Sequence, residues 1–414
     1  MPEERTILHC DCNSFYASVE SLERPELRTV PMAVCGDPKS RHGIILAKNE
    51  LAKGFGVRTA ETVGQALKKC PQLTLVPPHR ERYERVSRLI NAIYGAYTDQ
   101  VEPFSIDESW LDVTGSLHLF GTGEQIAHEL RRRVREEVGV TISVGVSFNK
   151  IFAKLGSDYR KPDATTVITR ENFRQILWPL PAEAMMFVGH AAAEALAGAG
   201  IRTIGDMAAA GKERLRAVLG SAGETLWTYA MGLDGSRVRR ADETPPPRSI
   251  GCGTTFSHDL AGERALRAGL LPLCERVGAR LRAHKLYCTT VQVQIRDPFF
   301  KTVSRQQRLP APTSVTRELY EAAAALVLRQ CGGGAPVRML TVTATGLTDC
   351  CAAQMRLIGD GTEAHLRGER LDSALDGIRA RFGEDAIAPA ERARRGGRGP
   401  LSAAASCAKS APRR

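Results

Sequence analysis

The hydrophobic pattern of residues 6–146 predicts a mixed sheet covered by helices. Apolar residues recur at helical spacing from 81 to 97 and again from about 123 to 138, where Ile126, Leu130 and Val134 share one face. Short apolar runs and alternating segments predict strands. The expected strands cover residues 6–10, 30–36, 43–48, 105–113 and 141–146, and a short helix covers 15–22. The order indicates one sheet with a small lobe inserted into it, ending near Pro78.

A different pattern begins after residue 171. Residues 172–240 read as helices with a Gly-containing hairpin, and the prolines of Ala241–Arg248 predict a stiff linker. Beyond it the pattern is strand, helix, strand, strand, helix, strand, over 249–258, 265–284, 288–296, 301–308, 314–330 and 338–346. Helical spacing returns from Leu371 to Phe382. Residues 391–414 hold seven Lys/Arg and one acid, which predicts a disordered basic tail.

Composition and net charge indicate the kind of binding partner and the cellular compartment. A chain of 414 residues predicts roughly two to four domains, and its net charge of +11 favours a polyanionic partner, with solubility alone as the alternative. The 11 cysteines form no paired Cys-x-x-Cys motif, so we expect a reducing cytoplasm, with Cys10 and Cys12 as small buried residues rather than metal ligands. No secretory signal and no apolar run of about 18 residues is found, so no membrane span is expected.

Two predicted strands carry acids at their ends. Asp11 follows Ile7-Leu8-His9-Cys10, and Asp107 and Glu108 stand in Ser105-Ile106-Asp107-Glu108-Ser109-Trp110-Leu111. Three converging carboxylates need divalent metal to neutralise them. Two ions roughly 3.5–4 Å apart, held by shared carboxylates, are what an in-line phosphoryl displacement needs. The two segments therefore predict nucleotidyl transfer, with a solvated strand end as the alternative.

These segments, with Phe15-Tyr16-Ala17, Ser143-Val144-Gly145-Val146-Ser147-Phe148-Asn149-Lys150, Ala153-Lys154, Ser157-Asp158 and Lys161-Pro162, resemble the Y-family translesion DNA polymerases of the DinB (DNA polymerase IV) type, also called the ImpB/MucB/SamB family. The resemblance covers nearly the whole chain. It implies an α+β multidomain fold: a right-hand polymerase with palm, small fingers, helix-hairpin-helix thumb and a βαββαβ little finger. It also implies template-directed, low-fidelity addition of dNTPs to a primer 3′ end, in translesion synthesis during DNA repair.

The resemblance also divides the chain into domains. The implied catalytic palm covers 1–14 and 80–171, the fingers 15–79, the thumb 172–240, the linker 241–248 and the little finger 249–350. A C-terminal helical extension follows over 351–390, before the basic tail of 391–414.

The implied site follows residue by residue. Asp11, Asp107, Glu108 and the backbone carbonyl of Cys12 would bind two Mg²⁺ ions, with Mn²⁺ as a possible substitute. Phe15 and Tyr16 are expected at the nucleotide site: Tyr16 matches the steric gate, a ring that rejects a ribose 2′-hydroxyl, and Phe15 would pack behind it. Lys161 matches the residue that meets the triphosphate, and the neighbouring Lys154 is interpreted as surface charge.

The fingers depart from the family pattern. In place of Tyr-x-Ala-Arg before Phe-Gly-Val stands Glu50-Leu51-Ala52-Lys53. Lys53 keeps the positive charge for nucleotide binding but loses the planar fork of arginine, and Glu50 should repel a triphosphate. This departure keeps a second hypothesis open, a DNA-binding accessory protein of the same fold with weak or no catalysis. A cyclase with a palm-like sheet is the third, disfavoured by the extra domains.

Further contacts are expected outside the catalytic sheet. The hairpin residues Val188 and Gly189 would bind a DNA phosphate through backbone amides, although Phe187 replaces the family's first hairpin glycine. Lys301, Arg305 and Arg308 are expected to contact DNA phosphates, with a solvated face as the alternative. Gln354, Leu357 and Ile358 resemble a peptide that docks in the bacterial sliding clamp. The partners implied are primer–template DNA, dNTP and the clamp. The resemblance also implies a monomer in the bacterial cytoplasm that associates with the nucleoid.

Overall fold

The computed structural model describes residues 4–38, 40, 43–243, 245–331, 334–350, 361–383 and 386–387. It divides into two compact units, Met1–Thr244 and Pro245–Arg414, and the division falls inside the predicted linker. The finer boundaries between palm, fingers and thumb stay predictions. In the described part of the chain, no helix is both long and apolar enough to cross a membrane.

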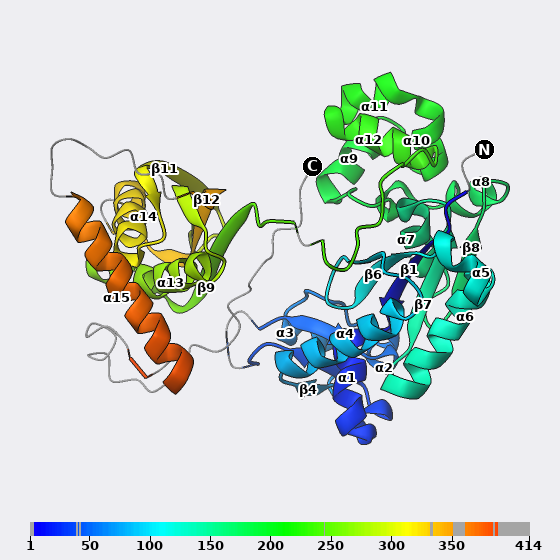
Figure 1. Cartoon of the computed structure of the whole chain (residues 1–414), viewed down its shortest axis with the longest axis horizontal. Coiled ribbons are helices and arrows are strands. Elements are labelled where there is room, and N and C mark those ends of the chain that lie inside the picture. The colour runs from blue at the N-terminus through cyan, green and yellow to red at the C-terminus, as the bar shows by residue number, and fades with distance from the viewer. Residues whose placement is uncertain are drawn as a thin grey trace. The chain divides into compact units, whose positions relative to one another are not determined.

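The first unit is built on a five-stranded sheet (Figure 1). Its strand order is β5 (Val101–Pro103), β6 (Glu108–Asp112), β1 (Ile7–Cys12), β7 (Ile142–Ser147) and β8 (Thr165–Ile168). The central strand β1 runs antiparallel to both of its neighbours, and all six of its residues are buried. A strand buried on both faces reads as a continuous apolar run rather than an alternating one, which explains why Ile7-Leu8-His9-Cys10 shows no alternation.

Helices pack on both faces of this sheet. One face forms a core with α1 (Phe15–Glu23), α4 (Arg80–Gly95) and α6 (Gly123–Arg133). On the other, α7 (Lys150–Tyr159) lies directly on β7, because Gly145 has no side chain: a Cβ there would stand 1.9 Å from the carbonyl oxygen of Ala153. The predicted helix over 123–138 ends as α-helix at Arg133, and Val134–Val138 continues it as a π-helix.

Two smaller parts complete the first unit. The inserted lobe between α1 and α4 is a three-stranded sheet in the order β3 (Ile45–Lys48), β2 (Met32–Cys35), β4 (Thr74–Val76), with two helices, α2 (Glu50–Gly54) and α3 (Val63–Lys69). The helical part holds α8 (Phe173–Leu177), α9 (His190–Gly198), α10 (Ile204–Ala210), α11 (Lys212–Leu219) and α12 (Ser221–Ala230). Its core includes Phe152 of α7, so it packs on the same helix that covers the main sheet.

The second unit confirms the predicted strand and helix order. It contains β9 (Ser249–Leu260), α13 (Glu263–Ala283), β10 (Tyr287–Arg296), β11 (Thr302–Thr313), α14 (Thr316–Cys331) and β12 (Val337–Thr348), and its antiparallel sheet has the order β11-β10-β12-β9. A further helix, α15 (Gly361–Phe382), begins well before the predicted Leu371. It is fixed to the unit by Arg282, which pairs with Asp372 at 3.0 Å and Asp376 at 2.6 Å.

Candidate active site

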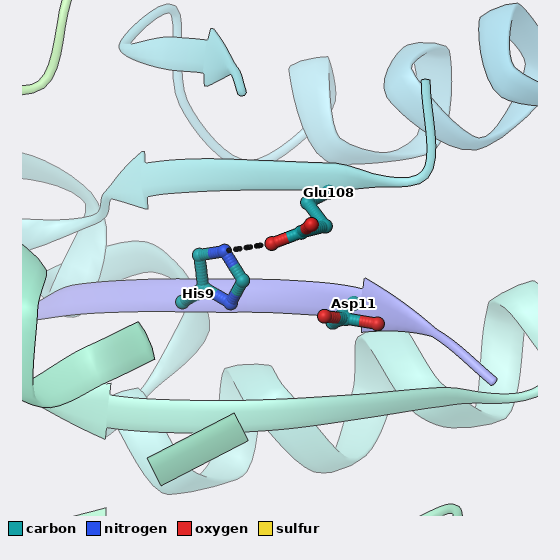
Figure 2. Close-up of side chains that lie close together, drawn as sticks. All are labelled: His9, Asp11 and Glu108. Carbon is teal, nitrogen blue, oxygen red and sulfur yellow. Dashed lines mark ion pairs between the residues drawn. The ribbon is translucent and has the colours of Figure 1, made fainter. Parts of the chain in front are cut away.

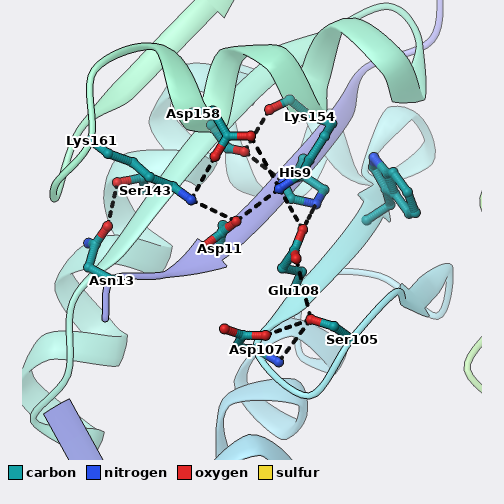
Figure 3. Close-up of polar contacts among 12 residues, drawn as sticks. His9, Asp11, Asn13, Ser105, Asp107, Glu108, Ser143, Lys154, Asp158 and Lys161 are labelled. Carbon is teal, nitrogen blue, oxygen red and sulfur yellow. Dashed lines mark hydrogen bonds and ion pairs between the residues drawn. The ribbon is translucent and has the colours of Figure 1, made fainter. Parts of the chain in front are cut away.

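The strand register brings the predicted acids together. Asp11 and Glu108 are direct partners on neighbouring antiparallel strands, and the amide of Cys12 donates to the carbonyl oxygen of Asp107 at 3.0 Å. Asp11 is buried, whereas Asp107 and Glu108 are partly exposed. The strands differ slightly from the prediction: Asp11 lies inside β1 rather than after it, and Asp107 precedes β6. The two segments still bring three acidic residues to adjoining ends of β1 and β6 (Figure 3), although the ligand atoms within 4.8 Å of one another in the described residues are those of His9, Asp11 and Glu108, without Asp107.

Two lysines from α7 and the turn after it lie among these acids. The ammonium of Lys154 stands 3.0 Å from Asp11, 2.6 Å from Glu108 and 3.3 Å from Asp158. That of Lys161 stands 2.8 Å from Asp11 and 2.7 Å from Asp158 (Figure 3). The interpretation of Lys154 as surface charge is wrong, because its side chain is 14% exposed and bridges two of the predicted metal ligands.

A buried histidine, His9, completes the cluster and was not predicted as a site residue. His9, Asp11 and Glu108 each offer a ligand atom within 4.8 Å of the others (Figure 2). The ring Nε2 lies 3.3 Å from Glu108, and Nδ1 lies 2.8 Å from the hydroxyl of Ser157 on α7. The signal for it was present, since side chains two apart on a strand share a face and His9 stands two before Asp11. Nothing in the sequence, however, placed Ser157 against that face.

The pKa shifts show how unevenly charge is balanced in the cluster. Burial alone would raise the pKa of Glu108, but the contact with His9 and the charge of Lys154 outweigh it and hold the pKa at about 2. Burial lowers the pKa of His9, so the ring is neutral at pH 7. Burial, together with the charges of Asp11 and Glu108, raises the pKa of Asp107. Its carboxylate accepts a hydrogen bond from Ser105 at 2.6 Å.

This donor set fits a hard divalent cation. Three carboxylates at one sheet edge supply the oxygen ligands that Mg²⁺ prefers. Burial raises the pKa of Asp107 first, and the charges of Asp11 and Glu108 add to it, whereas Lys154 and Lys161 pair with Asp11 rather than with Asp107. Cys10 and Cys12 are buried as expected, and burial raises the pKa of both thiols, so neither is a ready thiolate ligand.

The predicted gate residue stands on a rigid support. The Tyr16 ring is half-buried and stacks on Tyr83 with centroids 4.2 Å apart and planes 12° apart. The Tyr83 hydroxyl donates to Glu20 at 2.5 Å, and Glu20 is fully buried. His79 donates to the same carboxylate at 2.8 Å. Phe15 is 3% exposed and packs in the core of the main sheet, behind Tyr16 as expected.

Of the remaining predicted residues, those that the structure describes lie on other elements than β1, β6 and α7. Lys53 is exposed on α2 and pairs with Glu50 at 3.3 Å. Val188 and Gly189 precede α9, with Gly189 as its N-cap and Phe187 at φ 69°. Lys301, Arg305 and Arg308 are exposed, on β11 or just before it. The clamp-type residues Gln354, Leu357 and Ile358, like the tail over 391–414, lie outside the described residues.

Comparison with known proteins identifies the family. The model described as impB/mucB/samB family matches residues 10–158, and that of its C-terminal domain matches 247–357. DNA polymerase IV of Acetivibrio thermocellus is 46% identical over 382 residues, which cover 92% of this chain and 95% of the relative. DNA polymerase IV of Clostridium acetobutylicum is 35% identical over 92% of this chain and 97% of the relative. DNA polymerase IV 2 of Bacillus subtilis is 37% identical over 94% of each chain.

A solved structure confirms the predicted fold class. A Y-family DNA polymerase chimera superposes with a TM-score of 0.74 at 23% identity, covering 82% of this chain and 98% of that one. The chain therefore belongs to the impB/mucB/samB family, the Y-family DNA polymerases of the DNA polymerase IV type.

Proposed function

We propose that this chain is a template-directed DNA polymerase that adds dNTPs to a primer 3′ end with low fidelity, in translesion synthesis during DNA repair. The observation that carries the proposal is the register that pairs Asp11 with Glu108 and sets Asp107 beside them. Family membership and relatives named DNA polymerase IV support it. The partners we propose are primer–template DNA, dNTP and the sliding clamp, for a monomer in the bacterial cytoplasm.

Asp11, Asp107, Glu108 and the carbonyl of Cys12 would hold two Mg²⁺ ions, with Mn²⁺ as a substitute. When bound, such ions would supply activation of the primer 3′-hydroxyl and neutralisation of the pyrophosphate. The protein's part is to hold the carboxylates in place before substrate arrives. Backbone pairing fixes Asp11 and Glu108, and His9 and Lys154 orient the Glu108 side chain.

Two residues would recognise the incoming nucleotide. Lys161 lies 2.8 Å from Asp11, so its ammonium is already at the acidic edge and would turn from Asp158 to the triphosphate. Tyr16 would exclude a ribose 2′-hydroxyl, because the stacked Tyr83 prevents its ring from retreating. Lys53 would add a further charge from the fingers.

A second candidate function is a DNA-binding accessory protein with little catalysis. It is favoured by the pairing of Lys53 with Glu50 at 3.3 Å, where the family pattern has arginine and tyrosine. The retention of the whole acidic cluster with Lys161 argues against it.

Single-nucleotide primer extension with Mg²⁺ separates the two functions. Wild type and Asp107→Ala are compared, with binding of primer–template followed in parallel. The polymerase proposal predicts extension by wild type, and binding without extension by the variant. Equal binding with no extension by either protein, under varied metal and salt, would leave the accessory function.

A further inference from the structure

The turn between β10 and β11, residues 297–301, has a fixed shape. The Asp297 carboxylate accepts from the amides of Phe299 and Lys301, both at 2.9 Å. The Asp297 amide donates to the carbonyl of Lys301 at 3.0 Å, and the Phe300 amide donates to the carbonyl of Asp297 at 3.1 Å. Phe300 is held at φ 66°, a conformation that bulky residues avoid. These hydrogen bonds fix the backbone of the turn, and the Asp297 carboxylate is occupied by two of them.

This turn presents two phenylalanine rings to solvent. Phe299 is 88% exposed and Phe300 is 64% exposed. Among the large apolar side chains in the described ranges, that of Phe299 is the most exposed. The core of the unit is formed by residues of β9, β10, β12, α13 and α14, and neither ring is among them. Rings kept outside the core by a strained, hydrogen-bonded turn suggest a binding role.

The surroundings of the rings are cationic. The guanidinium of Arg338, on β12, lies over the ring of Phe300 at 4.7 Å. The β10–β11 hairpin, residues 287–313, carries four Lys or Arg side chains and one acid, Asp297. Lys301, just before β11, and Arg305, within β11, are both exposed. An apolar groove on a protein partner would accept the rings but would not need cations beside them.

We propose that the turn 297–301 is a stacking platform for single-stranded DNA, with Phe299 receiving an unpaired base. Surfaces that bind single strands combine aromatic rings, on which bases stack, with cations that follow the phosphates. Arg338 already covers Phe300, so Phe299 is the ring that offers a face. Lys301 and Arg305 would contact the phosphates on either side. The inference extends the proposed function by naming the unpaired template strand as the ligand of this turn.

The test compares Phe299→Ala with wild type in the full chain. Fluorescence anisotropy measures affinity for a primer–template with a 5′ overhang and for a blunt duplex with the same paired length. We expect overhang DNA to bind about tenfold more weakly, as for loss of one stacked base, and blunt duplex to bind as before. The factor should be the same at every salt concentration, because the ring carries no charge. Lys301→Ala should instead reduce the slope of log affinity against log salt by about one.

Phe382→Ala is the matched control, since that ring is 74% exposed on α15. It should leave both affinities unchanged, and thermal unfolding should show that each variant is folded. If Phe299→Ala binds overhang DNA as tightly as wild type does, the inference is overturned. An equal loss of affinity for blunt duplex also overturns it. Either result would favour a protein partner as the ligand of the two rings. Wild type that extends primers alongside such a result keeps the polymerase function. Wild type that binds no DNA overturns both proposals.

Discussion

Substitution of Glu20 by alanine tests the support beneath the proposed steric gate. Glu20 is fully buried on α1, and its carboxylate accepts from Tyr83 at 2.5 Å and His79 at 2.8 Å. Arg82 lies 3.6 Å away. Tyr83 in turn carries the stacked ring of Tyr16. Glu20→Ala therefore removes the acceptor of a buried hydroxyl and leaves a cavity behind the ring that holds the gate.

The size of the effect follows from burial. His79 and Arg82 are 40% and 33% exposed, so water can replace Glu20 as their partner, and the group left without a partner in the core is the Tyr83 hydroxyl. An unsatisfied buried polar group costs about 1–3 kcal/mol in the free energy of unfolding. For a unit of this size, each kcal/mol shifts the melting temperature by roughly 2–4 °C, so we expect a fall of about 2–12 °C. Glu20→Gln keeps one acceptor oxygen and should cost less. Glu26→Ala is the matched control, because that side chain is 70% exposed and lies 3.7 Å from Arg24, and surface pairs contribute about 0–1 kcal/mol.

Scanning calorimetry measures the melting temperature. Primer extension with dNTP or rNTP measures how strongly the protein prefers dNTP over rNTP. In Glu20→Ala, assayed below its melting temperature, we expect the preference for dNTP to weaken, because Tyr83 no longer holds Tyr16 in place. A melting temperature equal to that of Glu26→Ala would refute the energetic reasoning. A large fall in stability with an unchanged dNTP preference would refute the link between Glu20 and the gate.

Three further predictions concern the gate and the acidic cluster. Tyr16→Ala should raise kcat/KM for rNTP relative to dNTP by about 5- to 150-fold, the equivalent of a steric clash of about 1–3 kcal/mol, measured by single-nucleotide extension. Lys161→Ala should raise the KM for dNTP by about 10- to 150-fold, because a charge-assisted hydrogen bond contributes about 1.5–3 kcal/mol, and an unchanged KM would exclude a triphosphate contact. In metal-free protein, Glu108 contributes stability that is present above pH 4.5 and lost as pH falls toward about 2. The difference in urea midpoint between wild type and Glu108→Gln should therefore shrink below pH 4.5, and a constant difference would contradict the shift.

The sequence was sufficient to predict that the segments around Asp11 and Glu108 would meet, but not how they pair. Strand pairing can slip by one residue without changing which segments are neighbours, and each slip turns every side chain to the other face. Asp11 faces Glu108 because Ile7 pairs with Asp112. This register is set by the packing of the whole sheet, and neither motif determines it alone. The second unit was easier to predict, because alternation along Val291 to Arg296 indicated both the strand and its buried face.

His9 and Lys154 were missed for a different reason. Both were visible as residue types, yet their roles depend on how closely α7 approaches the sheet. That approach is set by Gly145, where any side chain would collide with the backbone of α7. Once the helix lies on β7, Lys154 cannot remain in solvent, and its charge is balanced by Asp11, Glu108 and Asp158. The sequence neighbours of Lys154 indicated a solvated side chain. Lys154 belongs to the site because Gly145, on β7, lets α7 lie close to the sheet.

The departure in the fingers changes both charge, through Glu50, and geometry, through Lys53. Glu50 and Lys53 are each more than half exposed and pair at 3.3 Å, one turn apart on α2. An exposed helical pair of this kind contributes only about 0.3–0.5 kcal/mol, so opening it for a phosphate costs little. What lysine cannot replace is the planar fork that binds two oxygens at once. The acidic cluster and Lys161 are therefore expected to support the chemistry. Lys53 is expected to bind the triphosphate more weakly than an arginine at this position would.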